Sequence, residues 1–336
     1  MRTRKALVTG CCGFIGAHLT RQLVNEGWIV EGVDDLSNGD LVALEGLQFR
    51  TVTRHVLHLY DKDAPPAEAG NLLVITSDFA SAPILERVHS GRYDVIFHLA
   101  ANPRVEFSVK YPALSTHTNV QKTIELMSAA IKNIDRFVFA SSSACYGEVS
   151  NLPTAENEAE DPTSPYGLQK LVVEQFGEMY NRLYEMDFVA LRFFNAYGPG
   201  QLGDSPYSTA IAAWCSCLSQ GNALRSDGDG EQTRDMVYVG DISNAMIIAA
   251  NHPNSIGYNM FNVATGDSVS NNQILATLKE HFPNMTVTHA PGRPGDVKHT
   301  LGCINKVSNE LGWQPQVKFW DGLMQTLKWW ELLSDE

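Results

Sequence analysis

The sequence predicts an α/β fold, a doubly wound parallel sheet with helices on both faces, and two observations lead to this prediction. Short runs of apolar, β-branched residues alternate with longer segments of helical periodicity in the first half of the chain. The runs are apolar almost throughout, as strands are when both faces of their sheet are covered. This alternation is typical of a doubly wound sheet. The expected strands are Ala6–Thr9, Trp28–Val33, Leu72–Thr76, Val95–Leu99 and Phe137–Ala140.

The segments between these strands carry the apolar spacing of amphipathic helices. The clearest are His18–Glu26, Ile84–Ser90 and Asn119–Lys132. After about residue 195 the pattern loosens, and Gly/Pro-rich connections occur near 198–203, 227–230 and 291–295. We therefore expect residues 1–190 to form the doubly wound domain and residues 191–336 to form a smaller mixed lobe, with some interleaving of the two.

Composition narrows the classes of partner. The 336-residue chain has 25 basic and 38 acidic side chains and a formal net charge of −13, which repels nucleic acid and anionic lipid. We expect neither as a partner, and an anionic substrate needs local arginines. The six cysteines show no metal-ligand spacing with histidines, which predicts reduced thiols and no metal site. Since no apolar stretch reaches the roughly 18 residues of a membrane span, we expect a soluble, cytoplasmic protein.

A glycine-rich turn follows the first expected strand. Gly10, Gly13 and Gly16 frame this turn, and Phe14 and Ile15 open the helix after it. Glycine lets the backbone turn tightly and approach a pyrophosphate, and the N–H groups at the start of a helix face anionic phosphates. A glycine turn alone is common in ordinary structure, but between a strand and a helix it predicts a dinucleotide-binding site.

Two carboxylates, Asp34 and Asp35, follow the second expected strand, about 20 residues beyond the glycines. A carboxylate there accepts hydrogen bonds from both ribose hydroxyls of an adenosine and repels a 2′-phosphate. NAD is therefore expected in preference to NADP, with Ser37, Asn38 and Gly39 beside it. The alternative interpretation is a solvated turn.

Tyr166 and Lys170 lie four residues apart near the start of a predicted helix and project from the same face. A free tyrosine has a pKa of about 10, and lowering it by about three units takes about 4 kcal/mol of charge stabilisation. A neighbouring ammonium and a nicotinamide cation can supply it. Ser142 ends another expected strand, where α/β folds place ligands, and offers a hydroxyl. Tyrosine and lysine at this spacing are common on amphipathic helices, so the order of all the signals carries the prediction of a catalytic site.

These signals in this order resemble the extended short-chain dehydrogenase/reductases, a Rossmann-fold family, and within them the UDP-glucose 4-epimerase-like enzymes of sugar nucleotides. The resemblance covers nearly the whole chain. Beyond the motifs above, it rests on His98-Leu99-Ala100-Ala101, Asn119-Val120, Ser141 to Gly147, Leu191 to Pro199, Gln232 to Asp235 and Arg293 to Asp296.

The resemblance implies a role for each matching residue. Tyr166 is then the base, Lys170 binds the nicotinamide ribose and tunes Tyr166, and Ser142 is the hydroxyl partner. The further implied cofactor contacts are Asp78 and Phe79 near the adenine, followed by Leu99, Ala100, Ala101 and Asn119. The implied substrate contacts are Asn195, Arg234 and Arg293 with a diphosphate, Asp296 with a ribose, and Asn102, Ser143 and Thr300 near the sugar. Arginine forks match diphosphate oxygens, and the alternative for both arginines is surface ion pairing.

The expected reaction is 4-epimerisation. Oxidation at C4 needs a base for the hydroxyl proton and a nicotinamide for the hydride. Epimerisation follows when the 4-keto sugar turns over and takes the same hydride back, which regenerates NAD. A 4,6-dehydratase needs a further acid and base, which its family members carry as Asp-Glu directly after the serine or threonine. Ser143 and Ala144 stand there in this chain, and the glutamate of the decarboxylases is also missing.

We therefore expect an NAD-dependent isomerase acting on a UDP-hexose, a UDP-N-acetylhexosamine or a UDP-hexuronate. The alternatives are a dehydratase, reductase or decarboxylase of the same family, and a non-catalytic dinucleotide-binding sensor or scaffold. By similarity, Thr300 borders the sugar, where a small residue admits an N-acetyl group.

Two further features concern assembly and the variable parts of the chain. The helices near Pro112–Lys132 and Pro165–Tyr184 resemble the four-helix dimer seam of the relatives, so we expect a homodimer. Gly46–Asn71 is longer than the usual link between second and third strands, and such insertions are often functional or disordered. Its His55 and His58 are expected on an exposed loop face rather than at a metal.

Overall fold

The structure is a computed structural model that describes residues 3–55, 57, 71–203, 209–292 and 297–334. The chain divides into two compact units. Unit 1 comprises Met1–Cys145, Ser164–Arg192 and Ser243–Phe261, and unit 2 comprises Tyr146–Thr163, Phe193–Ile242 and Asn262–Glu336. The units therefore interleave along the chain, since residues 146–163 and 243–261 cross the boundary expected near residue 190.

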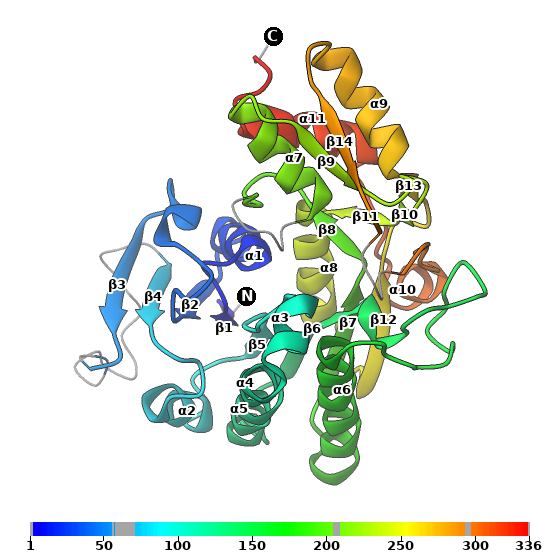
Figure 1. The fold of residues 1–336 in the computed structure, drawn as a ribbon. Helices are drawn as coiled ribbons and strands as arrows, with labels where there is room; N and C mark the ends of the chain where they lie inside the picture. The colour runs from blue at the N-terminus through cyan, green and yellow to red at the C-terminus, as the bar shows by residue number, and fades with distance from the viewer. Residues whose placement is uncertain (1–2, 56, 58–70, 204–208, 293–296, 335–336) are drawn as a thin grey trace. The chain divides into compact units, whose positions relative to one another are not determined.

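Unit 1 contains most of an eight-stranded sheet with the order β12-β7-β6-β5-β1-β2-β4-β3 (Figure 1). Its strands are β1 (Lys5–Thr9), β2 (Ile29–Asp34), β3 (Phe49–Thr53), β4 (Leu72–Thr76), β5 (Val95–His98), β6 (Arg136–Ser142), β7 (Phe188–Phe193) and β12 (Tyr258–Val263). The pairs from β3 through to β6 are parallel. The chain proceeds from β1 to β2 on one side and crosses to β5 on the other, and ligands of α/β sheets bind at such a switch point. The predicted doubly wound fold is confirmed.

The helices of unit 1 supply much of its core. They are α1 (Phe14–Asn25), α2 (Ala82–His89), α3 (Val105–Lys110), α4 (Pro112–Thr116), α5 (Lys122–Ala130), α6 (Pro165–Tyr184) and most of α8 (Val239–Asn251). Ile84 of α2, Met127 of α5 and Val173 of α6 join Phe137 of β6 in one buried cluster. Within the described residues, none of the chain's helices combines the length and the apolar character needed to cross a lipid bilayer.

Two elements differ from the sequence-based expectations. β3, at the sheet edge, lies inside the segment 46–71 that we expected to be an insertion, and it pairs in parallel with β4. Only Val52 of β3 is buried, so its sequence lacks the apolar run that identified the other strands. The helix expected over 119–132 is also interrupted, because residues 117–121 form a π-helix before α5. π-helical turns inside helices are frequent at functional sites.

α6 is fixed at its start by its own sequence. Ser164 is the N-cap, and its hydroxyl accepts a hydrogen bond from the N–H of Gly167 at 3.1 Å. Pro165 occupies the first turn, where its missing N–H costs nothing. The helix therefore begins immediately before Tyr166, and its first two turns carry the predicted tyrosine and lysine.

Unit 2 is built from short strand pairs with helices around them. β8 (Asn195–Tyr197) pairs in parallel with β11 (Met236–Tyr238), and β9 (Leu224–Asp227) pairs in parallel with β14 (Val287–Ala290). β10 (Thr233–Arg234) is antiparallel to β13 (Val269–Ser270). The helices are α7 (Ala210–Ser219), α9 (Asn271–His281), α10 (Asn305–Leu311) and α11 (Phe319–Trp329). A separate apolar cluster that includes Tyr197, Trp214, Leu278 and Leu323 forms the core of this unit.

Candidate active site

The glycine turn after β1 leaves no room for side chains at two of its positions. Gly10 has φ +74°, and a Cβ there would lie 2.9 Å from the amide nitrogen of Ala100. A Cβ on Gly16 would lie 1.9 Å from the carbonyl oxygen of Gly10. α1 begins at Phe14 with Gly13 as its N-cap, and no side chain caps it. The N–H groups of its first turn, including that of Ile15, therefore suit an anionic pyrophosphate.

At the end of β2, Asp34 and not Asp35 faces this turn. The Asp34 carboxylate accepts hydrogen bonds from the N–H groups of Cys12 and Leu36, both at 2.9 Å. Asp35 is exposed and accepts from the N–H of Ser37. Burial raises the pKa of Asp34, and the two backbone hydrogen bonds oppose that rise. One carboxylate is thus held at the glycine turn, as an adenosine ribose site requires.

The loop after Asp35 packs on the same turn. A Cβ on Gly39 would lie 2.7 Å from the carbonyl oxygen of Cys12, so only glycine fits this approach. Ser37 and Asn38 are exposed beside it. Of the predicted cofactor residues on this loop, Gly39 therefore has the clearest structural requirement.

A buried threonine and histidine fix the backbone after β5, which the sequence reasoning did not foresee. The hydroxyl of Thr9 accepts hydrogen bonds from the N–H groups of Leu99 and Ala100, both at 3.2 Å, and lies 2.7 Å from Nδ1 of His98. Its proton therefore goes to Nδ1, which leaves Nε2–H of His98 to donate to Thr123 at 2.9 Å. Burial lowers the pKa of His98 to about 3, so the ring is neutral.

Other predicted cofactor residues make contacts within unit 1. The Asp78 carboxylate forms an ion pair with Lys122. The side chain of Asn119, in the π-helix, accepts from the N–H of Asn102 at 2.7 Å and donates to its carbonyl at 3.1 Å. It also donates to Gln169 of α6 at 2.7 Å, so Asn119 connects the loop after β5 with the helix that carries Tyr166. The remaining predicted cofactor residues here are Phe79, which is buried, and Ala101, which is half-buried.

The three predicted catalytic residues come together where β6 ends. The hydroxyl of Ser142 accepts a hydrogen bond from the N–H of Ala144 at 3.2 Å and lies near enough to the phenol of Tyr166 to affect its pKa. The ammonium of Lys170 donates to the carbonyl of Ala140 at 2.7 Å and lies 5.7 Å from the ring centroid of Tyr166. A proton-accepting phenol thus has a hydroxyl and a cation beside it.

The electrostatics of this group differ from the expectation that Tyr166 is acidic. Burial raises the pKa of Tyr166, and the nearby hydroxyl of Ser142 only partly opposes the rise. Burial also lowers the pKa of Lys170 to about 8, against the attraction of the Glu174 carboxylate. The protein alone therefore does not produce a phenolate at neutral pH, and the contribution of the nicotinamide cation stays a prediction.

Unit 2 brings together three of the predicted substrate residues. The hydroxyl of Thr300 accepts from the N–H of Asp235 at 3.2 Å and donates to the side chain of Asn195 at 3.4 Å. The guanidinium of Arg234, half-buried, donates to the carbonyl of Lys298 at 3.1 Å. Asn195, Arg234 and Thr300 thus belong to one group around β8 and β10.

The buried carboxylate of Asp235 holds this group in place. In the sequence, Asp235 was noted only as the last residue of a motif. Asp235 accepts from the N–H and the hydroxyl of Thr265, both at 2.7 Å, and from the N–H groups of Gly266 and Gly302, both at 3.1 Å. Burial raises its pKa, and these four hydrogen bonds oppose the rise. The signal available in the sequence was its position directly after Arg234.

The other predicted substrate residues are Arg293, Asp296 and Ser143. Arg293 and Asp296 lie outside the described residues. Ser143 is half-buried in the 3₁₀ turn that directly follows β6. Its neighbour Ala144 occupies the second position that a dehydratase needs for an acid or base.

The sheet, the glycine turn and the catalytic group together define a class of protein. A doubly wound sheet with a glycine turn at β1 and a carboxylate at the end of β2 is typical of dinucleotide-binding proteins. A half-buried tyrosine on α6, with a lysine and a serine beside it at the carboxyl end of β6, has the chemistry of a proton carrier. The class is a nicotinamide-dependent enzyme.

Comparison with known proteins identifies the family. The family model described as GDP-mannose 4,6 dehydratase matches residues 7–326. The chain is 31% identical to the UDP-glucose 4-epimerase of Mycolicibacterium smegmatis, over 96% of this chain and 97% of that protein. The chain therefore belongs to that family, the NAD-dependent epimerases and dehydratases of the extended short-chain dehydrogenase/reductases.

Solved structures agree with this assignment. The UDP-N-acetylglucosamine 4-epimerase of Methanobrevibacter ruminantium, in complex with UDP-N-acetylmuramic acid, has a TM-score of 0.86 and 33% identity, with 98% of this chain and 99% of that chain covered. The UDP-glucose 4-epimerase of Thermus thermophilus, in complex with NAD, has a TM-score of 0.81 and 27% identity, with 97% and 99% covered.

Proposed function

We propose that the protein interconverts the C4 epimers of a UDP-sugar, with NAD bound at the glycine turn. The observation that carries this proposal is the Ser142–Tyr166–Lys170 group at the end of β6. The likeness to 4-epimerases solved with NAD and with a UDP-sugar supports the cofactor and the substrate class.

The cofactor preference follows from Asp34. Its carboxylate lies at the glycine turn and is the charge that a 2′-phosphate would meet. NAD is therefore favoured over NADP. The three glycines and the uncapped start of α1 fit the pyrophosphate.

The residues of the site divide the proton chemistry between them. When bound, NAD supplies the acceptor for the hydride from C4. Tyr166 takes the proton of the C4 hydroxyl as the hydride leaves, and returns it when the hydride adds to the other face of the 4-keto sugar. Ser142, which lies near the phenol of Tyr166, orients the reacting oxygen with its hydroxyl. Lys170 holds positive charge near the phenol and binds the nicotinamide ribose.

Epimerisation is favoured over dehydration, although the matching family model carries a dehydratase description. Removal of water across C5 and C6 needs an acid and a base beside the sugar. Ser143 and Ala144 stand at the positions where dehydratases carry them, and neither side chain titrates near neutral pH.

The diphosphate and the sugar are assigned to the group in unit 2. Asn195, Arg234 and Arg293 bind the diphosphate, and Asp296 binds the ribose of the nucleotide. Thr300 borders the sugar and has a short side chain, which leaves room for an N-acetyl group. UDP-N-acetylglucosamine, UDP-glucose and UDP-glucuronate are the substrates to test first.

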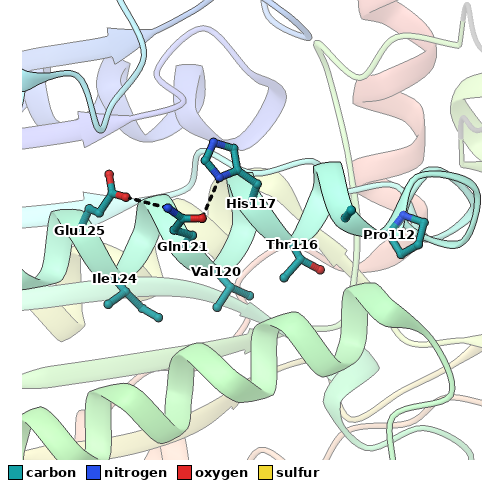
Figure 2. Close-up of a pocket in the computed structure, with 8 residues that line it drawn as sticks. Pro112, Thr116, His117, Val120, Gln121, Ile124 and Glu125 are labelled. Atoms are coloured by element: carbon teal, nitrogen blue, oxygen red, sulfur yellow. Dashed lines mark hydrogen bonds between the residues drawn. The ribbon is translucent and has the colours of Figure 1, made fainter.

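We further propose that two copies of the chain associate through unit 1 in the cytoplasm. An open hollow of about 590 Å³ runs along α4, the π-helix and α5 (Figure 2). Val120 and Ile124 point to one side of this helical segment, while hydrogen bonds join His117, Gln121 and Glu125 on its other side. On the adjacent α6, three apolar side chains are 44–62% exposed: Leu168, Met179 and Leu183. Light scattering should give the mass of a dimer, and a Leu183→Glu variant should give that of a monomer.

The reaction itself is tested with purified protein, NAD and each of the three UDP-sugars. ¹H NMR should show conversion of at least one of them to its 4-epimer and an equilibrium mixture of the two. A 4-keto product, carbon dioxide or net NADH would indicate one of the other activities of the family. No change in any sugar nucleotide would contradict the proposal.

A further inference from the structure

A second buried charge lies directly behind the catalytic residues of α6. Glu174 follows Lys170 by four residues and Tyr166 by eight, so all three share one face of the helix. The Glu174 side chain is 1% exposed, and that of its partner Arg192 on β7 is fully buried. The guanidinium donates to both carboxylate oxygens, at 3.0 Å from Nε and 2.5 Å from the terminal nitrogen.

The same carboxylate also reaches the end of β6. Ser141 donates a hydrogen bond to Glu174. Because successive residues of a strand point to opposite faces, this anchor on Ser141 fixes the direction of the next side chain, Ser142. The thiol of Cys145 lies 3.7 Å from the hydroxyl of Ser141 and 3.8 Å from Glu174. Glu174 thus joins three elements, α6, β6 and β7, at the point where the catalytic residues emerge.

The surroundings of Lys170 contain few groups that act on its charge. The titratable side chains that face it are Tyr166 and Glu174 on α6, Cys145 in the turn after β6, and His98 on β5, while Arg192 of β7 lies behind Glu174. His98 is neutral and Cys145 is a thiol, since burial raises the pKa of Cys145 to about 12. Glu174 is therefore the formal negative charge among these described groups.

We propose that Glu174 is a positioning residue, which keeps the Lys170 ammonium charged and holds the end of β6 against α6. Arg192 and Ser141 fix its carboxylate in place. A buried pair of this kind is weak evidence for stability, because apolar residues of similar volume often stabilise a fold as well or better. Its effect on turnover rests on the epimerase function proposed above, whereas its effect on Lys170 does not.

The chain contains a matched control. Glu31 on β2 is also buried and pairs with Arg87, but its contacts are with Arg92 and Tyr93, not with the catalytic residues. Glu174→Gln and Glu31→Gln each remove one buried carboxylate, the first from the guanidinium of Arg192 and the second from two guanidinium groups. Both variants should lose thermal stability, but only the first should alter Lys170.

The experiment follows the ionisation of Lys170 itself. In protein labelled with ¹³C-lysine, the Cε signal of Lys170, assigned by its loss in Lys170→Arg, is recorded against pH. The midpoint should fall by about one pH unit in Glu174→Gln, because a nearby opposite charge has been removed, and should be unchanged in Glu31→Gln. An unchanged midpoint in Glu174→Gln would overturn the proposal, as would an equal fall in both variants.

A second variant covers the case in which Glu174→Gln does not fold. Glu174→Gln combined with Arg192→Met leaves no unpaired buried charge. The Lys170 midpoint should again fall, but by less than in Glu174→Gln, because the positive charge of Arg192 is removed as well; no fall would again overturn the proposal. In assays of UDP-sugars, the alkaline limb of kcat/KM should move down by the same amount. If the Lys170 midpoint falls while neither wild type nor variant converts any UDP-sugar, the epimerase assignment fails and the positioning role stands.

Discussion

Unit 1 contains two buried carboxylates, Glu31 and Glu174, that are bound by the same kinds of group. Their comparison shows how the position of a charge in the sheet decides its function. Glu31 accepts from Arg87 at 2.7 and 3.0 Å, from Arg92 at 2.7 Å and from the phenol of Tyr93 at 2.6 Å. Glu174 accepts from Arg192 and from a hydroxyl. Each is a charged acceptor held by a guanidinium and an O–H group.

The difference lies in where the two clusters sit on the sheet. Glu31 is in the middle of β2, three residues before the ligand end of that strand. Its pKa is lowered, because Arg87 and Arg92 outweigh the effect of burial, so it is a permanent structural charge. Glu174 lies behind the ligand end of β6, beside residues whose pKa values are shifted by burial. Similar chemistry therefore serves the fold at one place and the proposed reaction at the other.

The largest effect is expected when one phenolic hydroxyl is removed, either from Tyr166 on the helix of Glu174 or from Tyr93, which contacts Glu31. Tyr166→Phe should lower kcat by about 10³, since it removes the proton carrier. Tyr93→Phe should leave kcat within about twofold and lower only the stability. Steady-state assays of both variants check this, and equal losses of activity would break the comparison.

The next effect concerns stability. Glu31→Gln leaves Arg87 and Arg92 facing an uncharged amide in a buried site, which should cost about 3 kcal/mol of unfolding free energy. The activity of the folded protein should be unchanged. Urea unfolding gives the first quantity, and an assay at a temperature well below the transition gives the second; a loss of activity without loss of stability would contradict the structural role of Glu31.

A third, smaller effect is expected three residues further along the same strand. Asp34→Asn should weaken NAD binding by about thirtyfold, because it loses a charge-assisted hydrogen bond to the ribose. Asp35→Asn, on the exposed neighbour, is the matched control and should bind NAD normally. Calorimetric titration with NAD measures both, and the opposite order would assign the ribose to Asp35.

The smallest effect, about tenfold over the first pH unit above 8, is the pH dependence of the wild type. Burial lowers the pKa of Lys170 to about 8, so the ammonium is present below this pH and is lost above it. The value of kcat/KM should therefore fall above about pH 8, by about tenfold for each pH unit. The same limb should be present in Glu31→Gln, and a flat profile up to pH 10 would contradict the role given to Lys170.

Local patterns in the sequence predicted much of the fold and the site, and the rest depended on tertiary contacts. The apolar runs of β1, β2, β4, β5 and β6 identified these strands, whereas the edge strand β3 has one buried residue and no such run. Tyr166 and Lys170 stand out because they lie four positions apart on one helix. Glu174 has the same spacing from Lys170, but its proposed role depends on its contacts with Arg192 of β7 and Ser141 of β6, which are distant in the sequence. The raised pKa of Tyr166 likewise comes from burial, which no local pattern contains.

The most direct test of the central claim is the fate of the hydrogen at C4. Each UDP-sugar is prepared with deuterium at C4 and incubated with the protein and NAD in ordinary water. If Tyr166 moves only the proton and the hydride returns to the same carbon, NMR and mass spectrometry will show the 4-epimer with its deuterium retained at C4. A product with hydrogen at C4, a 4-keto-6-deoxy sugar, or no product from any substrate would contradict it.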